Sequence, residues 1–428
     1  MGQDGDPWGM RVKKSENHQE QGAAGQQASP APQAQLRPDL LLLPLDDDVI
    51  AFSEEVQRIA ALNTSAAYIA RRMQKGIPVS ALAQDLVSGG LAAPGQAEGW
   101  VAAVLDALGS HGLLANRQPP APPLSEEEGH DARMVRIMPA FTFMEAVAEQ
   151  RYQLLDTCAL VRFTHKDQVS LVDCIIGHLK TDSLAEPTVT FHLNFKTQAN
   201  GDIHTDVYKD TTPVGYAPRL GRLGPLVKGA FWSAAINAHN FLFYIHAGTV
   251  GTDQACVLLP AAPGSGKSSL TAALTHKGCR YFSDEVALIE PESFMVNPMP
   301  LAFCAKSTGW DVLAGYYPEI LSAPTHSRSD GKIVRYVAPP PASVQKTPAS
   351  ITHMVFPRYD KASKTELKPI ARSEALGRVM VECLGQKQRL DRNNVEQLIG
   401  WISGIQCYAL PFSSLDEATE LVLQAITR

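Results

Sequence analysis

The first third of the chain carries two different patterns of apolar and polar positions. Residues 40–45 and 49–52 are short apolar runs of the kind that form strands. Three stretches follow in which apolar residues recur every three or four positions, which is typical of helices. Thr64 or Ser65 is expected to cap the first helix. Strands followed by three short helices predict a winged-helix-like module over residues 36–116.

A second pattern occupies the rest of the chain. An apolar run at residues 255–260 (ACVLLP), a glycine-containing loop and a helical run at 269–276 follow one another directly. Further elements are expected on both sides of this segment. They are a helix at 144–155, strands at 188–195, 202–208, 286–289 and 406–410, and helices at 373–383, 393–402 and 415–426. This mixture predicts an α/β domain.

Two breaks in composition set the expected boundaries. Residues 1–35 are rich in Gln, Gly, Ala and Pro and lack apolar periodicity, so we expect a disordered tail. Residues 117–129 are proline-rich and then acidic, which indicates a linker. The chain beyond it, residues 130–428, is expected to form one large domain. Its first part, 130–230, is less readable than the loop-containing part, 231–428.

Charge and cysteine content exclude several classes of function. The 38 Lys and Arg residues are outnumbered by 44 Asp and Glu, and residues 36–116 contain five basic against nine acidic residues. We therefore expect no nucleic-acid partner. No apolar run is long enough to span a membrane, and the seven Cys show neither disulfide nor metal-site spacing. A cytoplasmic protein without a membrane partner is the expectation.

The loop at residues 261–268 (AAPGSGKS) carries the clearest chemistry. A strand, a glycine-rich loop and a helix in this order form the phosphate-binding Walker A arrangement. The backbone around Gly264, Ser265, Gly266 and Ser269 would enclose phosphate groups at the start of the helix. Lys267 would reach the β- and γ-phosphates, and Ser268 would offer its hydroxyl to Mg²⁺. The first position is Ala261, where glycine is usual.

Asp284 and Glu285 follow the loop helix closely. One carboxylate would accept the proton of an attacking hydroxyl, while the other would help Ser268 to hold Mg²⁺. Neighbouring side chains on a strand point to opposite faces, so the two carboxylates are expected to have different tasks. We favour Asp284 as the base, although the sequence does not decide between the two.

Several segments together resemble the catalytic domain of HPr kinase/phosphorylase, and the later ones resemble HPr-kinase-related proteins more closely. They are residues 244–248, 257–292, 297–307, 353–360 and 405–426. The resemblance implies the nucleotide-binding core shared with phosphoenolpyruvate carboxykinase, the use of ATP and Mg²⁺, and a homo-oligomer. Glu285 stands where HPr kinase has Asp, which leaves the reverse, phosphorylase reaction open.

The same resemblance assigns roles to three further residues. His246 would orient the acceptor or a carboxylate, and Lys306 and Arg358 would neutralise charge on the transferred phosphoryl group. Each has an ordinary structural alternative. His246 is also explained as a core histidine, Lys306 as a surface lysine, and Arg358 as an arginine at a strand end.

Residues 36–116 resemble the PqqD family through their apolar strand at 40–45, Leu62 with Asn63, and Gly112 with the two leucines that follow it. That family holds the leader of a precursor peptide by adding it as a strand to a sheet edge. A module that only supports the fold remains the alternative.

Together these features predict an ATP-dependent kinase that phosphorylates a Ser or Thr hydroxyl on a small ribosomally made peptide. A nucleotide-switched peptide scaffold and a small-metabolite kinase are the alternatives. The sequence does not identify the peptide, the modified residue, the preference for ATP over GTP or the oligomeric state.

Overall fold

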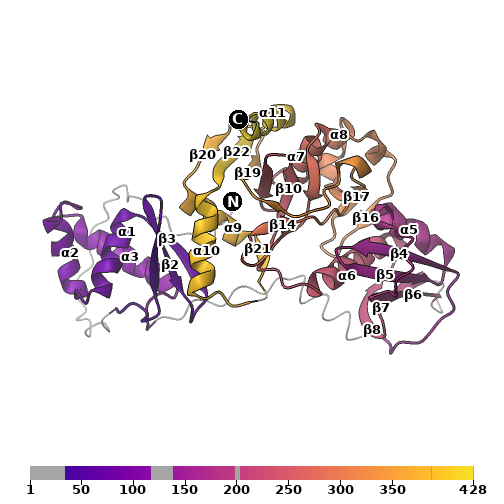
Figure 1. Ribbon diagram of the computed structural model, residues 1–428, viewed down its shortest axis with the longest axis horizontal. Helices are drawn as coiled ribbons and strands as arrows, with labels where there is room; N and C mark the ends of the chain where they lie inside the picture. Colours follow the sequence, from indigo (N-terminus) through magenta and orange to yellow (C-terminus); the bar gives the residue numbers. More distant parts are fainter. Residues whose placement is uncertain (1–33, 117–137, 198–202, 387, 428) are drawn as a thin grey trace, which may run out of the picture. The chain divides into compact units, whose positions relative to one another are not determined.

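The computed structural model describes residues 34–116, 138–197, 203–386 and 388–427 (Figure 1). The linker expected at 117–129 and nearly all of the tail expected at 1–35 lie outside these residues. The chain divides into two compact units. The first contains the N-terminal module together with Ile370–Val381 and Gln388–Cys407, and the second contains Pro123–Pro369, Glu382–Lys387 and Tyr408–Arg428.

The first unit begins with an antiparallel meander in the order β1-β2-β3, and three helices follow it. The elements are β1 (Leu41–Leu45), β2 (Asp48–Ser53), β3 (Arg58–Leu62), α1 (Thr64–Gln74), α2 (Val79–Ser88) and α3 (Ala97–Ser110). The cap of α1 is Asn63, whose side chain accepts from the N–H of Ala66 at 2.9 Å. The prediction of Thr64 or Ser65 was wrong by one residue, because the asparagine already satisfies a free N–H of the first turn.

Both faces of this small sheet are covered. Val49 and Ala51 belong to the core that the sheet shares with α1, α2 and α3. Ile50 and Phe52 alternate with them on the opposite face and are fully buried. On that side pack α9 (Arg372–Val381) and α10 (Arg392–Ser403), drawn in yellow beside the indigo strands in Figure 1.

Polar contacts fix these two helices to the turns of the meander. The Arg372 guanidinium pairs with Asp46 at 2.9 Å, and the Ser373 hydroxyl donates to Asp48. The backbone N–H of Leu390 donates to the Gln57 side chain at 2.7 Å. Two helices from the end of the chain are therefore part of the N-terminal unit, which the boundary expected at residue 116 does not include.

The second unit opens with a five-stranded sheet in the order β4-β5-β6-β7-β8. The strands are β4 (Ala148–Leu154), β5 (Thr157–Phe163), β6 (Val189–Thr197), β7 (Ile203–Lys209) and β8 (Thr212–Ala217), with α5 (Lys166–Ile176) and α6 (Leu223–Asn237) packed on them. The helix predicted at 144–155 was wrong. Tyr152 and Leu154 are buried two positions apart, and this strand periodicity overrides the helical one.

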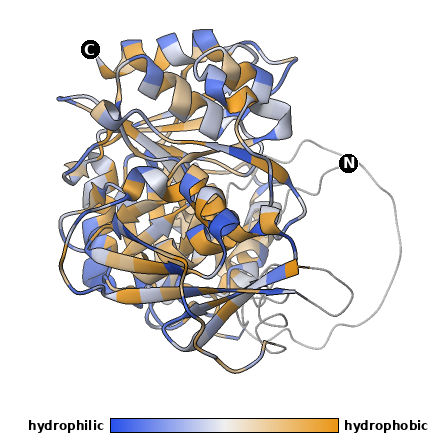
Figure 2. Cartoon of the chain, turned by 90° about the vertical axis from the view of Figure 1, so that its right-hand side faces the viewer, coloured by the Kyte–Doolittle hydropathy of each residue, from blue (hydrophilic) through white to orange (hydrophobic). Residues whose placement is uncertain are grey.

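The loop-containing core is built around a six-stranded sheet in the order β12-β10-β11-β19-β22-β20. Its strands are β10 (Ala247–Gly251), β11 (Cys256–Pro260), β12 (Arg280–Ser283), β19 (His353–Tyr359), β20 (Lys368–Pro369) and β22 (Gln406–Phe412). Helices α7 (Lys267–His276) and α11 (Leu415–Ile426) pack against each other beside it. Figure 2 shows hydrophilic and hydrophobic segments alternating along the helix next to the C-terminus, as expected for an amphipathic helix.

Two smaller sheets complete this unit. One has the order β18-β14-β13-β9-β21 and the other the order β15-β17-β16. The first contains β9 (Phe243–Ile245), β13 (Ala287–Ile289), β14 (Met295–Asn297), β18 (Ala349–Ser350) and β21 (Cys383–Gly385), and the second β15 (Phe303–Lys306), β16 (His326–Ser327) and β17 (Ile333–Val337). The short helix α8 (Trp310–Ala314) follows β15. The predicted mixed α/β architecture is confirmed.

None of the helices in the described part of the chain combines the length and the apolar character that a membrane span requires.

Candidate nucleotide site

The glycine-rich loop joins the end of β11 at Pro260 to the start of α7 at Lys267. Gly264 and Gly266 have φ of 96° and 84°, a backbone region that residues with a Cβ rarely adopt. A Cβ on Gly266 would also lie 2.5 Å from Cζ of Phe412. Glycine at position 266 is thus required both by the backbone angle and by the neighbouring ring.

The loop is held against the sheet by close backbone contacts. The N–H of Tyr359, at the end of β19, donates to the carbonyl of Ser265 at 2.9 Å. On the other side, Gly248 in β10 lets α7 approach, because a Cβ there would lie 2.2 Å from Oγ1 of Thr271. The backbone around the loop is thereby fixed before any ligand arrives.

Lys267 has an unusual environment for a lysine. Its relative exposure is 5%, and Nζ has no hydrogen-bond partner among the described residues. Burial lowers the pKa of Lys267 to about 8, although Asp284 and Glu382 partly offset this by favouring the charged form. The ammonium is still mostly protonated at neutral pH, so the loop holds a buried positive charge.

Asp284 lies in a bend directly after β12 and is 3% exposed. Oδ2 accepts from the backbone N–H of Cys304 at 3.4 Å, while Oδ1 has no partner in the described chain. Burial raises the pKa of Asp284 to about 6, against the opposing effects of Lys267, Ser268 and the Cys304 N–H. This carboxylate therefore changes its protonation state close to neutral pH.

Glu285 faces different partners. Its side chain is 29% exposed and forms an ion pair with the buried ammonium of Lys228 in α6. Burial works to raise the pKa of Glu285, but Lys228, with help from Arg328 and His246, lowers it below its usual value. The two neighbouring carboxylates thus have different environments. The expected strand geometry was wrong, since the two residues lie in a bend between β12 and β13.

His246 lies between β9 and β10. Its Nδ1 is 3.5 Å from Oε2 of Glu382, and its backbone N–H donates to the Glu382 carbonyl at 2.8 Å. Glu382 also favours the charged form of Lys267 and so belongs to the same group of residues. The sequence did not predict Glu382 or Lys228, because both come from segments far from the loop and carry no motif.

The remaining predicted residues lie around this centre. Ser265, Ser268 and Ser269 are in the loop and the first turn of α7. Lys306 is at the end of β15 and is close enough to Lys267 to disfavour its charged form. Arg358 is exposed on β19, one residue before Tyr359.

The buried polar atoms allow a test of whether a nucleotide fits here. Lys267 Nζ, Ser265 Oγ and Asp284 Oδ1 are all buried without a partner within the described residues, and such groups are costly to bury. Phosphate oxygens would accept from the first two. Among all the residues that the structure describes, no group of three or more His, Cys, Asp and Glu side chains is suited to hold a metal ion. A hydroxyl and phosphate oxygens are part of the usual Mg²⁺ site of such loops, and Ser268 at the start of α7 offers the hydroxyl.

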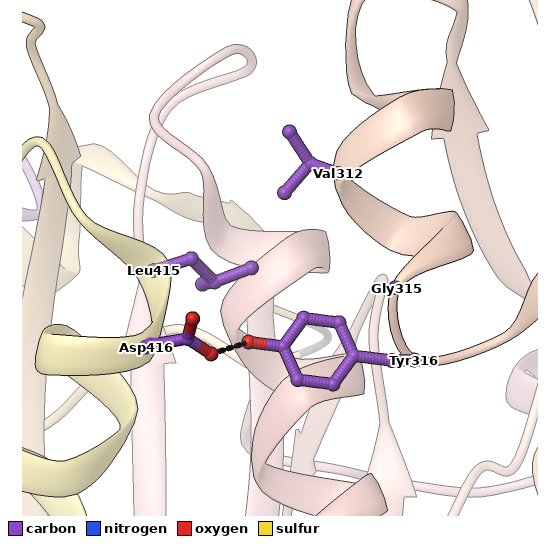
Figure 3. Close-up of a pocket in the computed structure, with 5 residues that line it drawn as sticks. All are labelled: Val312, Gly315, Tyr316, Leu415 and Asp416. Carbon is purple, nitrogen blue, oxygen red and sulfur yellow. Dashed lines mark hydrogen bonds between the residues drawn. The ribbon is translucent and has the colours of Figure 1, made fainter.

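A surface hollow of about 340 Å³ lies elsewhere in this unit, between α8 and the start of α11 (Figure 3). Tyr316 and Asp416 line it, and the tyrosine hydroxyl donates to the carboxylate. None of the predicted site residues lines this hollow. It is therefore separate from the loop centre.

No family model and no curated protein matches the chain. Among solved structures, the Hpr(Ser) kinase/phosphatase from Coxiella burnetii is similar to 42% of this chain and 89% of its own, at 14% identity and a TM-score of 0.21. At this TM-score the likeness supports no conclusion about fold or activity.

Proposed function

We propose that the chain is an ATP-dependent kinase that phosphorylates a Ser or Thr hydroxyl on a small ribosomally made peptide held by the N-terminal module. One observation carries the kinase proposal. Among the described residues, Lys267 Nζ and Asp284 Oδ1 are buried without a hydrogen-bond partner, beside a glycine-rich loop that begins a helix. Unsatisfied charge of this kind destabilises a fold, and a triphosphate with its acceptor would satisfy it.

The chemistry requires one proton to be accepted. The oxygen of the acceptor hydroxyl forms a bond to the γ-phosphorus, the bond from that phosphorus to the β,γ-bridging oxygen breaks, and ADP leaves. Asp284 takes the hydroxyl proton. Its pKa of about 6 leaves it ionised at neutral pH yet still basic enough to accept a proton. Lys267 neutralises charge on the phosphate oxygens.

Ser268 would hold Mg²⁺ together with phosphate oxygens, and the ion would supply further neutralisation of the phosphate charge. Glu285 was the other candidate ligand. Its carboxylate is engaged by Lys228, so it offers a metal less negative charge than an unpaired carboxylate would. The separation in pKa between the two carboxylates favours Asp284 as the base.

The proposed peptide partner is supported by the sheet of the N-terminal unit. Within the described residues, β1 and β3 each pair only with β2, so each leaves one strand edge. An extended leader would add to such an edge through backbone hydrogen bonds. Holding the leader raises the effective concentration of the rest of the peptide, so weak contacts at the catalytic site suffice.

Deleting the module would not test this proposal cleanly. The buried sheet face that carries Phe52 packs against α9 and α10, so a deletion would uncover these helices as well. The full chain should instead be given one core peptide with its leader attached, with the leader added separately, and without leader. We expect the attached leader to lower KM by about tenfold or more, and the separate leader to inhibit. Equal KM values for all three would contradict peptide capture.

A further inference from the structure

Three cationic side chains, those of Lys306, Arg328 and Lys332, gather on one face of the small sheet β15-β17-β16. Lys306, Val334 and His326 lie opposite one another in the register, so their side chains share a face. Arg328 and Lys332 continue β16 and β17 into the connecting turn, where the Arg328 N–H donates to the Lys332 carbonyl at 3.0 Å. By strand alternation they share the face of Lys306.

These cations are not neutralised within the described chain. Lys332 and Arg328 both approach one carboxylate, that of Asp330, at 2.8 and 3.5 Å. Lys306 has no carboxylate within ion-pair distance among the described residues. Burial lowers the pKa of Lys306, and the nearby charges of Lys332 and Arg328 lower it further. Arg328 also lies close enough to Glu285 to lower its pKa, and Lys228 pairs with Glu285. Counting both residues, four positive charges face two negative charges, which leaves an excess of two.

This face is connected to the proposed base. The backbone N–H of Cys304, in the same strand as Lys306, donates to Asp284. Cys304 and Lys306 are two residues apart, which is about 7 Å along a strand. An extended peptide whose acceptor hydroxyl meets Asp284 would cover the same distance with two residues.

We infer that Lys306, Arg328 and Lys332 form a subsite for the carboxylate of an acidic residue located two positions from the phosphorylated hydroxyl. The inference rests on the proposed function and adds a substrate class to it. The carboxylate of Glu285 does not occupy this subsite in the free protein, because it is paired with Lys228. The side chains of Arg328 and Lys332 are 31% and 49% exposed, so an incoming carboxylate can reach them.

The test compares twin synthetic peptides that contain a single Ser and differ only by Glu or Gln two positions to either side of it. Their binding to the full chain, saturated with Mg²⁺ and a non-hydrolysable ATP analogue, is followed by ligand-observed NMR, which measures weak affinities. We expect a Glu peptide to bind about threefold to tenfold more tightly than its Gln twin. The double variant Arg328→Met/Lys332→Met removes this preference, whereas Lys346→Met, at an exposed lysine elsewhere in the same unit, retains it.

A charge reversal gives a second readout that does not depend on a loss of binding. Lys332→Glu cancels the excess of two positive charges, so the Glu peptide should bind no more tightly than its Gln twin, which still binds. Equal binding of the twins, or binding of neither, would overturn the inference. It would also be overturned if the double variant weakened binding of a fluorescent ATP analogue and left the Glu preference intact, since the cations would then serve the nucleotide.

Phosphorylation of leader-bearing peptide is measured separately. Phosphorylation without any Glu preference refutes the subsite and leaves the kinase proposal standing. A Glu preference without phosphorylation of any peptide refutes the kinase and leaves a carboxylate-binding site.

Discussion

Asp284→Asn should make the ligand-free protein more stable while abolishing the proposed kinase activity. The folded-state pKa of Asp284 is about 6, above the ordinary value of 3.8. Folding therefore favours the protonated acid, and the stability that this group contributes is lost as pH rises from about 4 through about 6. Above this window the carboxylate is ionised in a buried site, whereas an asparagine of the same shape carries no charge.

The magnitude follows from the two pKa values. Their difference corresponds to about 3 kcal/mol at pH 8. The gain in stability is smaller than this figure, because Lys267 loses the carboxylate that favours its charged form. We expect a net gain of about 1–2 kcal/mol, which raises Tm by about 2–6 °C for a unit of this size.

Thermal unfolding followed by circular dichroism at several pH values measures the effect. The gain should be present at pH 8 and disappear towards pH 4, and Mg²⁺ with ATP should stabilise the variant less than the wild type. Asp253→Asn, at an exposed carboxylate paired with Arg280, is the matched control and should show no gain. A variant that is less stable than the wild type at pH 8 would refute the proposed cost of ionising Asp284.

Three further predictions concern the surroundings of the loop and the N-terminal unit. Gly266→Ala should weaken ATP-analogue binding more than Gly264→Ala, because both have positive φ but only the first Cβ meets a neighbouring ring; equal effects would contradict this. Lys228→Met should destabilise the protein by about 2–3 kcal/mol at pH 7, because Glu285 loses its partner. The loss should shrink as pH falls below about 4.5, since the pKa of Glu285 is lowered in the folded state, and a loss that does not depend on pH would indicate packing instead. Phe52→Ala should cost about 3–5 kcal/mol and speed proteolysis within α9 and α10; unchanged cleavage there would show that the sheet does not support these helices.

The parts of the site that could be predicted are local in sequence. The strand at 255–260, the glycine loop and the helix that begins at Lys267 follow one another directly, and each has its own pattern. The same holds for α11, whose apolar face recurs every four residues at Ala418, Val422 and Ile426. Here local preference and tertiary structure agree.

The parts that could not be predicted depend on segments far apart in the chain. Glu382 reaches His246 only because β21, which begins one residue later, pairs with β9. The same limit explains α9 and α10, which were predicted as amphipathic helices without any indication that they cover the N-terminal sheet. A periodic pattern shows that a face is buried and does not identify its partner.

The most direct test of the kinase proposal is intact-mass analysis of small peptides encoded beside the gene after incubation with the protein, Mg²⁺ and ATP. We predict a gain of one phosphoryl group on a Ser or Thr, absent with Lys267→Ala and with Asp284→Asn. Peptides that bind in the presence of nucleotide but never gain mass would contradict the proposal and favour a scaffold that only binds nucleotide.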